Sequence, residues 1–146
     1  MNPLSEVRSF SATLDSLQPI REFLVYSGKS IGLDIRRIYK LCLAVDEIAT
    51  NIINYGYVNS GIDRPFIEIN VTSNNEALTV ILEDTAVPFN PLEMAIPGEK
   101  ELSMPLEQRP IGGLGILLAK NNVDEFLYEY ENGKNRNIFH INLNQN

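Results

Sequence analysis

A glutamate and an asparagine at helical spacing are the first residues in this sequence that could do chemistry. Glu47 and Asn51 stand four positions apart, so on a helix their side chains are neighbours on one face. A carboxylate can act as a base or orient a water molecule, and an amide oxygen is a hard ligand suited to Mg²⁺. Taken alone, the pair is more typical of the solvated polar face of a helix.

An aspartate at the end of an apolar run is the second candidate. The segment ALTVILED at residues 77–84 is strand-like, and Asp84 ends it four residues before Pro88. The carboxylate could accept a hydrogen bond from an exocyclic amine such as that of adenine. The alternative is an aspartate that only closes the strand in a turn.

A glycine-rich motif is the third candidate. Gly112, Gly113 and Gly115, with Leu114 among them, account for three of the 9 glycines and precede an apolar, helix-like run. Two interpretations compete. The glycines turn the chain tightly into a helix, or they bring backbone N–H groups close to a phosphate, which helix N-termini bind well.

Hydrophobic periodicity predicts the elements that must position these residues. The expected helices cover residues 17–31, 34–57 and 115–121. The expected strands cover residues 6–13, 65–73, 77–84, 125–131 and 136–143. This order predicts an α+β two-layer sandwich, with helices on one face of a mixed, mainly antiparallel sheet. The remaining loop, about 85–111, holds five of the 8 prolines, and its length is typical of an active-site lid or a disordered segment.

The composition excludes several other classes of site. A net charge of −7 argues against a non-specific nucleic-acid surface. The single cysteine, Cys42, excludes an intrachain disulfide, and with the single histidine, His140, it excludes in practice a Cys/His metal site. No apolar run approaches the length of a membrane span, and the N-terminus lacks an apolar signal core. We therefore expect one cytoplasmic domain over residues 1–146 that contacts neither a membrane nor nucleic acid directly.

The order of these motifs resembles the GHKL (Bergerat) ATP-binding fold, and within it the anti-sigma factor serine/threonine kinases. The family's N-box is ExxxN followed by an aromatic residue or histidine, a small residue and tyrosine, and residues 47–51 and 55–57 match it. The second box, Asp-x-Gly-x-Pro-Phe-Asp/Asn-Pro, is similar to residues 84–91. The third, Gly-Gly-Leu-Gly, is identical at residues 112–115. The resemblance covers about residues 5–143, with the loop 85–111 as the ATP lid.

The resemblance implies a role for each matched polar residue. Glu47 would be the general base that helps a substrate serine attack the γ-phosphate of ATP. Asn51 would ligate the Mg²⁺ that bridges the phosphates. Asp84 would receive the adenine amine in a box that also contains Pro88.

The resemblance also implies how phosphates are held. Backbone N–H groups would cradle them at Gly112, Gly113, Leu114 and Gly115. Of the two interpretations of the glycine-rich motif, the resemblance therefore favours phosphate binding. Arg109, in the lid, could contact the γ-phosphate, but an ordinary solvated arginine is an equal alternative.

Two positions depart from the family pattern. Ala86 stands where the second box has glycine, so it weakens ATP binding if that glycine needs a positive φ or a close approach to the nucleotide. Ile138 stands about where many relatives place a hydroxyl residue near the adenine.

The function implied is that of an ATP- and Mg²⁺-dependent serine/threonine protein kinase. Its substrate would be a STAS-type anti-anti-sigma protein, its other partner a sigma factor, and the enzyme a homodimer that regulates transcription by partner switching. The alternative is a partner-binding regulatory module whose nucleotide site is weak or vestigial because of Ala86. The ATPase part of a two-component histidine kinase is less favoured, because His140 lies in a predicted strand.

Overall fold

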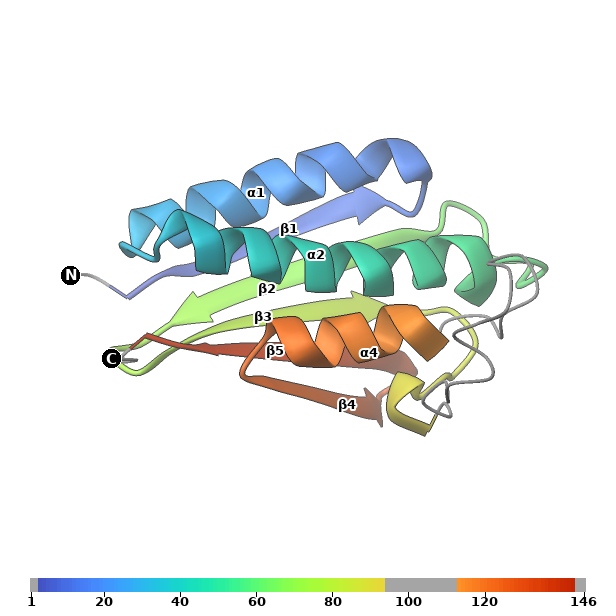
Figure 1. Cartoon of the computed structure of the whole chain (residues 1–146). Coiled ribbons are helices and arrows are strands. Elements are labelled where there is room, and N and C mark those ends of the chain that lie inside the picture. Colours follow the sequence, from blue (N-terminus) through green and yellow to red (C-terminus); the bar gives the residue numbers. More distant parts are fainter. Residues whose placement is uncertain (1–2, 94–112, 144–146) are drawn as a thin grey trace.

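The computed structural model of the chain describes residues 3–93 and 113–143, and only the backbone of residues 113 and 114. In this part of the chain three helices cover one face of a five-stranded sheet (Figure 1). The helices are α1 (Leu17–Ser30), α2 (Ile35–Asn51) and α4 (Gly113–Asn122). The strands are β1 (Ser5–Ser11), β2 (Phe66–Ser73), β3 (Ala77–Asp84), β4 (Glu125–Glu131) and β5 (Lys134–Asn142). The α+β sandwich expected from the sequence is confirmed.

The sheet has the strand order β1-β2-β3-β5-β4, and each neighbouring pair is antiparallel. The described strands therefore contain no parallel pairing, and the sheet is antiparallel rather than mixed. The pairing of β3 with β5 sets Asp84 directly opposite Asn135. This register joins the end of one strand to the start of another that lies about fifty residues further along the chain.

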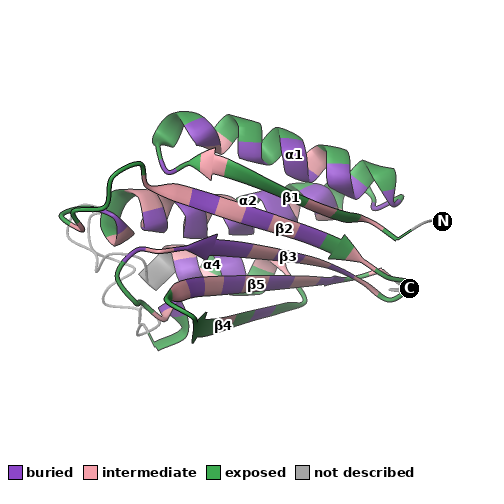
Figure 2. Ribbon diagram, turned by 180° about the vertical axis from the view of Figure 1, so that it is seen from behind, coloured by how far each residue is buried: buried purple, intermediate pink, exposed green. Residues whose placement is uncertain are grey.

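Alternation along the strands separates the two faces of the sheet. Ile69, Val80 and Phe139 are fully buried beneath the helices, and their neighbours in sequence are only half-buried. Figure 2 shows this alternation of buried and intermediate residues along β2 and β5. The alternation reaches the acidic end of β3. Glu83 turns to the face without helices, where its carboxylate binds the Arg136 guanidinium at 2.7 Å. Asp84 is left on the helix-covered side.

The two long helices begin and end where local chemistry directs them. Gly32 takes a φ of 79° and ends α1, because only glycine adopts this conformation at little cost. Asp34 caps α2 by accepting a hydrogen bond from the backbone N–H of Arg37 at 2.9 Å. The helix expected to reach residue 57 changes character at Ile52–Gly56, which forms a π turn.

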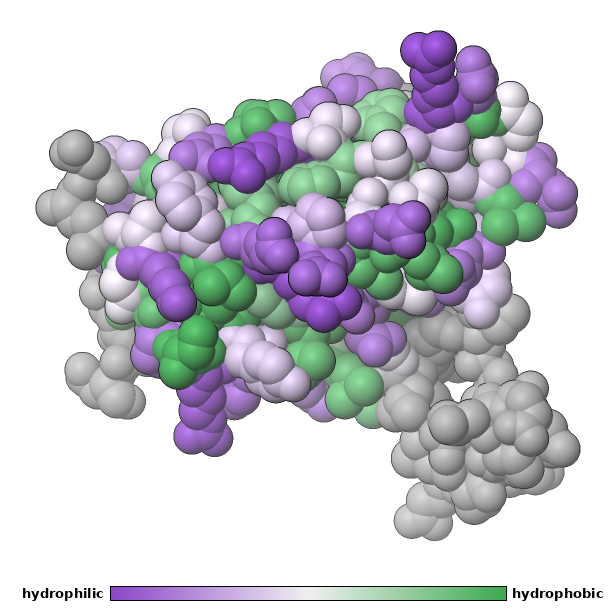
Figure 3. All heavy atoms as spheres, turned by 90° about the horizontal axis from the view of Figure 1, so that it is seen from above, coloured by the Kyte–Doolittle hydropathy of each residue, from purple (hydrophilic) through white to green (hydrophobic). Residues whose placement is uncertain are grey.

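A tight turn joins the last two strands. Asn132 and Gly133 take φ values of 54° and 76° and form the tight hairpin turn between β4 and β5. Seen from above, over α1 and β1, hydrophilic and hydrophobic residues are interspersed on the surface (Figure 3). Among the described residues, no helix combines the length and apolar character needed to cross a membrane.

Candidate functional site

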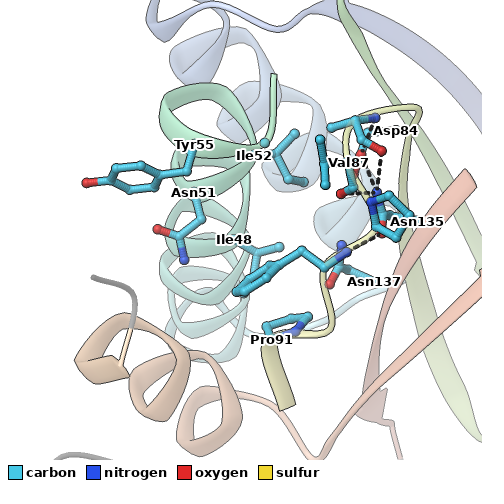
Figure 4. A pocket seen from close by; sticks show the side chains of 13 residues that line it. Ile48, Asn51, Ile52, Tyr55, Asp84, Val87, Pro91, Asn135 and Asn137 are labelled. Carbon is cyan, nitrogen blue, oxygen red and sulfur yellow. Dashed lines mark hydrogen bonds between the residues drawn. The ribbon is translucent and has the colours of Figure 1, made fainter. Parts of the chain in front are cut away.

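A pocket of about 400 Å³ opens between the end of α2 and the loop that follows β3 (Figure 4). Four of the residues predicted from the sequence line it: Asn51, Asp84, Ala86 and Pro88. The other lining residues are Ile48, Ile52, Tyr55, Gly56, Val87, Phe89, Pro91, Asn135 and Asn137. The walls are mostly apolar and carry a few polar groups, as is typical of sites for small organic ligands.

Asp84 is the most constrained of these polar groups, with only 1% of its surface exposed. Its Oδ1 accepts hydrogen bonds from the Ala86 backbone N–H at 3.0 Å and from Asn135 Nδ2 at 2.9 Å. Its Oδ2 is buried and has no hydrogen-bond partner among the residues that the structure describes. Burial raises the pKa of Asp84, and the two hydrogen bonds oppose that rise. The carboxylate therefore offers one open acceptor to a donor inside the pocket.

Asn135 organises the loop around that carboxylate. Besides Asp84, its Nδ2 reaches the backbone carbonyls of Ala86 and Val87, both at 3.2 Å. Its Oδ1 accepts from the backbone N–H of Phe89 at 3.1 Å and from the hydroxyl of Tyr128. One side chain of β5 thus holds the start of the loop in place.

The helical wall of the pocket carries Asn51, the last residue of α2. In Figure 4 it lies across the pocket from Asp84, on the helix and not on the sheet. Its amide nitrogen is buried and has no partner in the described part of the chain. The π turn begins at the next residue, and such turns are frequent at functional sites.

Glu47 lies one helical turn before Asn51 and is packed against α4. A Cβ placed on Gly115 would lie 2.5 Å from Glu47 Oε2, so the carboxylate occupies the space that this glycine leaves. Burial raises the pKa of Glu47, and the neighbouring Asp46 carboxylate raises it further. The structure therefore shows a reason for glycine at residue 115 that the sequence did not reveal, because a side chain there would collide with the Glu47 carboxylate.

The alanine that departs from the family pattern is accommodated. Ala86 is 5% exposed, and its φ lies outside the left-handed region, so alanine causes no backbone strain there. Its methyl group faces the backbone of Gly56 across the pocket wall.

Strand alternation corrects one expectation and adds two residues. Ile138 does not face the pocket. It lies on the opposite side of the sheet, because the buried residues of β5 alternate with it: Asn135, Asn137, Phe139 and Ile141. Asn137 lines the pocket with a buried Oδ1 that has no partner among the described residues. The signal in the sequence was two asparagines at core-facing positions of an otherwise apolar alternation.

Several predicted residues lie outside the described part of the chain. They are Arg109, Gly112 and residues 94–111 of the expected lid. Gly113 opens α4, two residues earlier than expected, and Gly115 lies in its first turn. The role of Leu114 rests on its backbone, which belongs to the same turn.

Comparisons with known proteins agree with this architecture. The family model described as a histidine kinase-like ATPase domain matches residues 10–141. No curated protein matches the sequence. Among solved structures, the chain is similar to the crystal structure of the RsbU and RsbW domains of Rv1364c from Mycobacterium tuberculosis, with a TM-score of 0.65 at 15% identity. The match covers 97% of this chain and 32% of that one, so the chain spans about a third of its length.

The contact between Gly115 and Glu47 predicts the effect of a methyl group at residue 115. Gly115→Ala is expected to displace the Glu47 carboxylate toward solvent and to lower the pKa of Glu47, because less of its burial remains. The free energy of unfolding should change by no more than about 1 kcal/mol, since the end of a flexible side chain moves easily and alanine favours the helix. Carboxyl-carbon NMR titration, with Glu47→Gln to assign the signal, measures this. An unchanged pKa of Glu47 would contradict the contact.

The buried carboxylate of Asp84 predicts a pH-dependent stability. The pKa of Asp84 is raised in the folded chain, so folding favours the protonated carboxyl group. The free energy of unfolding therefore keeps the full contribution of Asp84 at low pH and loses it as the pH rises through the folded pKa. Asp84→Asn keeps the acceptor for Ala86 and Asn135 but carries no charge. The variant should gain stability relative to the natural chain as the pH rises, in urea unfolding from acid to neutral pH. Asp63→Asn, at an exposed position, is the control, and parallel pH curves for the natural chain and Asp84→Asn would exclude the effect.

Proposed function

Because the chain belongs to the histidine kinase-like ATPase family, we propose that its pocket binds ATP with Mg²⁺ and that the chain is a serine/threonine protein kinase. The observation that carries the proposal is the open Oδ2 of Asp84, an unpaired acceptor at the wall of a pocket of about 400 Å³. A buried acceptor without a partner is costly unless a ligand supplies a donor. The exocyclic amine of adenine is such a donor, and apolar residues such as Ile52 and Val87 offer surfaces for the ring.

The opposite side of the pocket is suited to the phosphates. The amide oxygen of Asn51 is a ligand of the kind that coordinates Mg²⁺ together with phosphate oxygens. The bound ion would neutralise phosphate charge. The first turn of α4, which contains Gly113 and Gly115, presents backbone N–H groups at a helix N-terminus, where anions are favoured.

Glu47 is suited to the proton transfer. In the proposed reaction a partner's hydroxyl oxygen bonds to the γ-phosphorus, the bond to the leaving oxygen of ADP breaks, and Glu47 takes the hydroxyl proton. Its raised pKa makes the carboxylate a better proton acceptor than an ordinary glutamate. Most of the acceleration would come from positioning and charge neutralisation, as in phosphoryl transfer generally.

The proposed partners follow from the resemblance to anti-sigma factor kinases. They are a STAS-type anti-anti-sigma protein as the phosphorylated substrate and a sigma factor as the regulated partner, with the kinase acting as a homodimer. The fold shared with the structure that contains an RsbW domain is compatible with this proposal. The alternative remains a binding module with a weak nucleotide site, and the unstrained backbone of Ala86 removes one reason for such weakness.

The direct test incubates the purified chain with γ-labelled ATP, Mg²⁺ and a STAS-type protein. We expect label on a serine or threonine of that protein, and none when Mg²⁺ is chelated. A stable complex with the partner, without transfer of label, would favour the binding module.

Glu47 should affect transfer much more than nucleotide binding. Glu47→Gln keeps the shape of the side chain but cannot accept the proton, so transfer should fall at least about 100-fold. The dissociation constant for ATP, measured by calorimetry, should stay within about threefold, because a base acts in the transition state. Asp46→Asn is the matched neighbouring control. Transfer by Glu47→Gln at the natural rate would refute the assignment of the base.

Burial raises the pKa of Glu47 most and the Asp46 charge raises it further, and this second cause gives a pH prediction. The base works when deprotonated, so kcat/KM should fall as the pH drops through a pKa above the usual glutamate range. Removal of the Asp46 charge lowers that pKa, so Asp46→Asn should move the acidic limb of the profile to lower pH. Arg21→Gln removes the 3.4 Å ion pair with Asp46 but keeps the Asp46 carboxylate. This variant tests whether the ion pair itself changes the pH at which the acidic limb falls. An acidic limb that stays in place in Asp46→Asn would show that Glu47 is not the titrating base.

A further inference from the structure

Two small residues meet in the pocket wall, one on the π turn after α2 and one on the loop after β3. We propose that the close contact between Gly56 and Ala86 leaves room for only one methyl group and so sets the spacing of these two segments on which nucleotide affinity depends, with Gly56 as the positioning residue. The affinity part rests on the proposed function. Both residues line the pocket, and a Cβ on Gly56 would lie 3.1 Å from the Ala86 Cβ and 3.8 Å from Ile52 Cγ2.

Space, and not backbone conformation, requires the glycine at residue 56. Gly32, Gly61 and Gly133 take positive φ values, but Gly56 does not. It ends a helical turn, where alanine is normally the more favourable residue. The methyl group of Ala86 explains the glycine, because it leaves little space for a second methyl group on residue 56.

Neither side of the contact can move freely. The Ala86 backbone is tied through its N–H to Asp84 and through its carbonyl to Asn135, at 3.0 and 3.2 Å. On the other side, the Tyr57 hydroxyl donates to the Phe66 carbonyl at 2.6 Å and accepts from the Thr85 backbone N–H at 2.9 Å.

An added methyl group is therefore expected to push the loop away by a few tenths of an ångström, together with the residues that hold it. The displaced loop begins directly after Asp84, whose carboxylate forms part of the proposed adenine site. A change at Gly56 is thus expected to reach the base-binding end of the pocket, although glycine has no side chain to contact a ligand.

Because residues 56 and 86 are in contact, substitutions at these two positions are expected to have non-additive effects on ATP affinity and melting temperature. Gly56→Ala should lower the melting temperature and weaken ATP binding about tenfold, because overpacking between fixed segments is costly. Ala86→Gly, which changes a residue of the pocket wall itself, supplies the second arm of the cycle. The double variant should recover the natural affinity within about twofold, because its single methyl group again fills the space. It should also melt at a higher temperature than Gly56→Ala.

The experiment is a double-mutant cycle measured by calorimetry with ATP and by thermal unfolding without nucleotide. The matched control combines Gly56→Ala with Ala12→Gly, which changes a buried alanine directly after β1. This variant should remain as weak in ATP binding as Gly56→Ala. A double variant as weak as Gly56→Ala, or a Gly56→Ala chain with natural affinity and melting temperature, would overturn the inference.

The two proposals fail in different ways. If the natural chain binds no ATP, the proposed function is wrong. The melting temperatures of the nucleotide-free variants then decide whether the contact fixes the spacing: coupling supports this and additive effects refute it.

Discussion

The fixed position of the Asp84 carboxylate is the constraint on which the rest of the site depends. A buried carboxylate is costly, and only one of its oxygens is satisfied by the described residues. The register of β3 against β5 offsets part of this cost, because it places Asn135 directly opposite Asp84, where the Asn135 amide donates to Oδ1. The same amide holds the carbonyls of Ala86 and Val87. The open oxygen and the loop beside it are therefore positioned by one cross-strand pair.

The helical wall is joined to this strand-based wall by contacts that involve little side-chain freedom. Tyr57 reaches from the end of the π turn to the backbone of Thr85, and Gly56 meets the methyl group of Ala86. On α4, Gly115 leaves room for the carboxylate of Glu47. Small residues thus allow the two walls of the pocket to approach closely and α4 to pack closely against α2.

The sequence predicted the elements well because their signals are local. The apolar stripe of α2 and the alternation of the strands each arise within a few residues. The order of the motifs also indicated the family. The role of Asn135 could not be predicted, because it depends on a strand register set by packing of the whole sheet. The same limit explains why Ile138 was expected near the pocket, whereas Asn137 faces it, and why the partner of Gly115 was missed.

We propose that Asp84 Oδ2, which has no partner among the described residues, accepts a hydrogen bond from the exocyclic amine of adenine. The affinity of the natural chain for ADP against inosine diphosphate tests it most directly, because the inosine base carries a carbonyl in place of that amine. Calorimetry with Mg²⁺ should show inosine diphosphate binding at least about tenfold more weakly, since two acceptors would face each other in a buried site. Equal affinities for the two nucleotides would contradict the account.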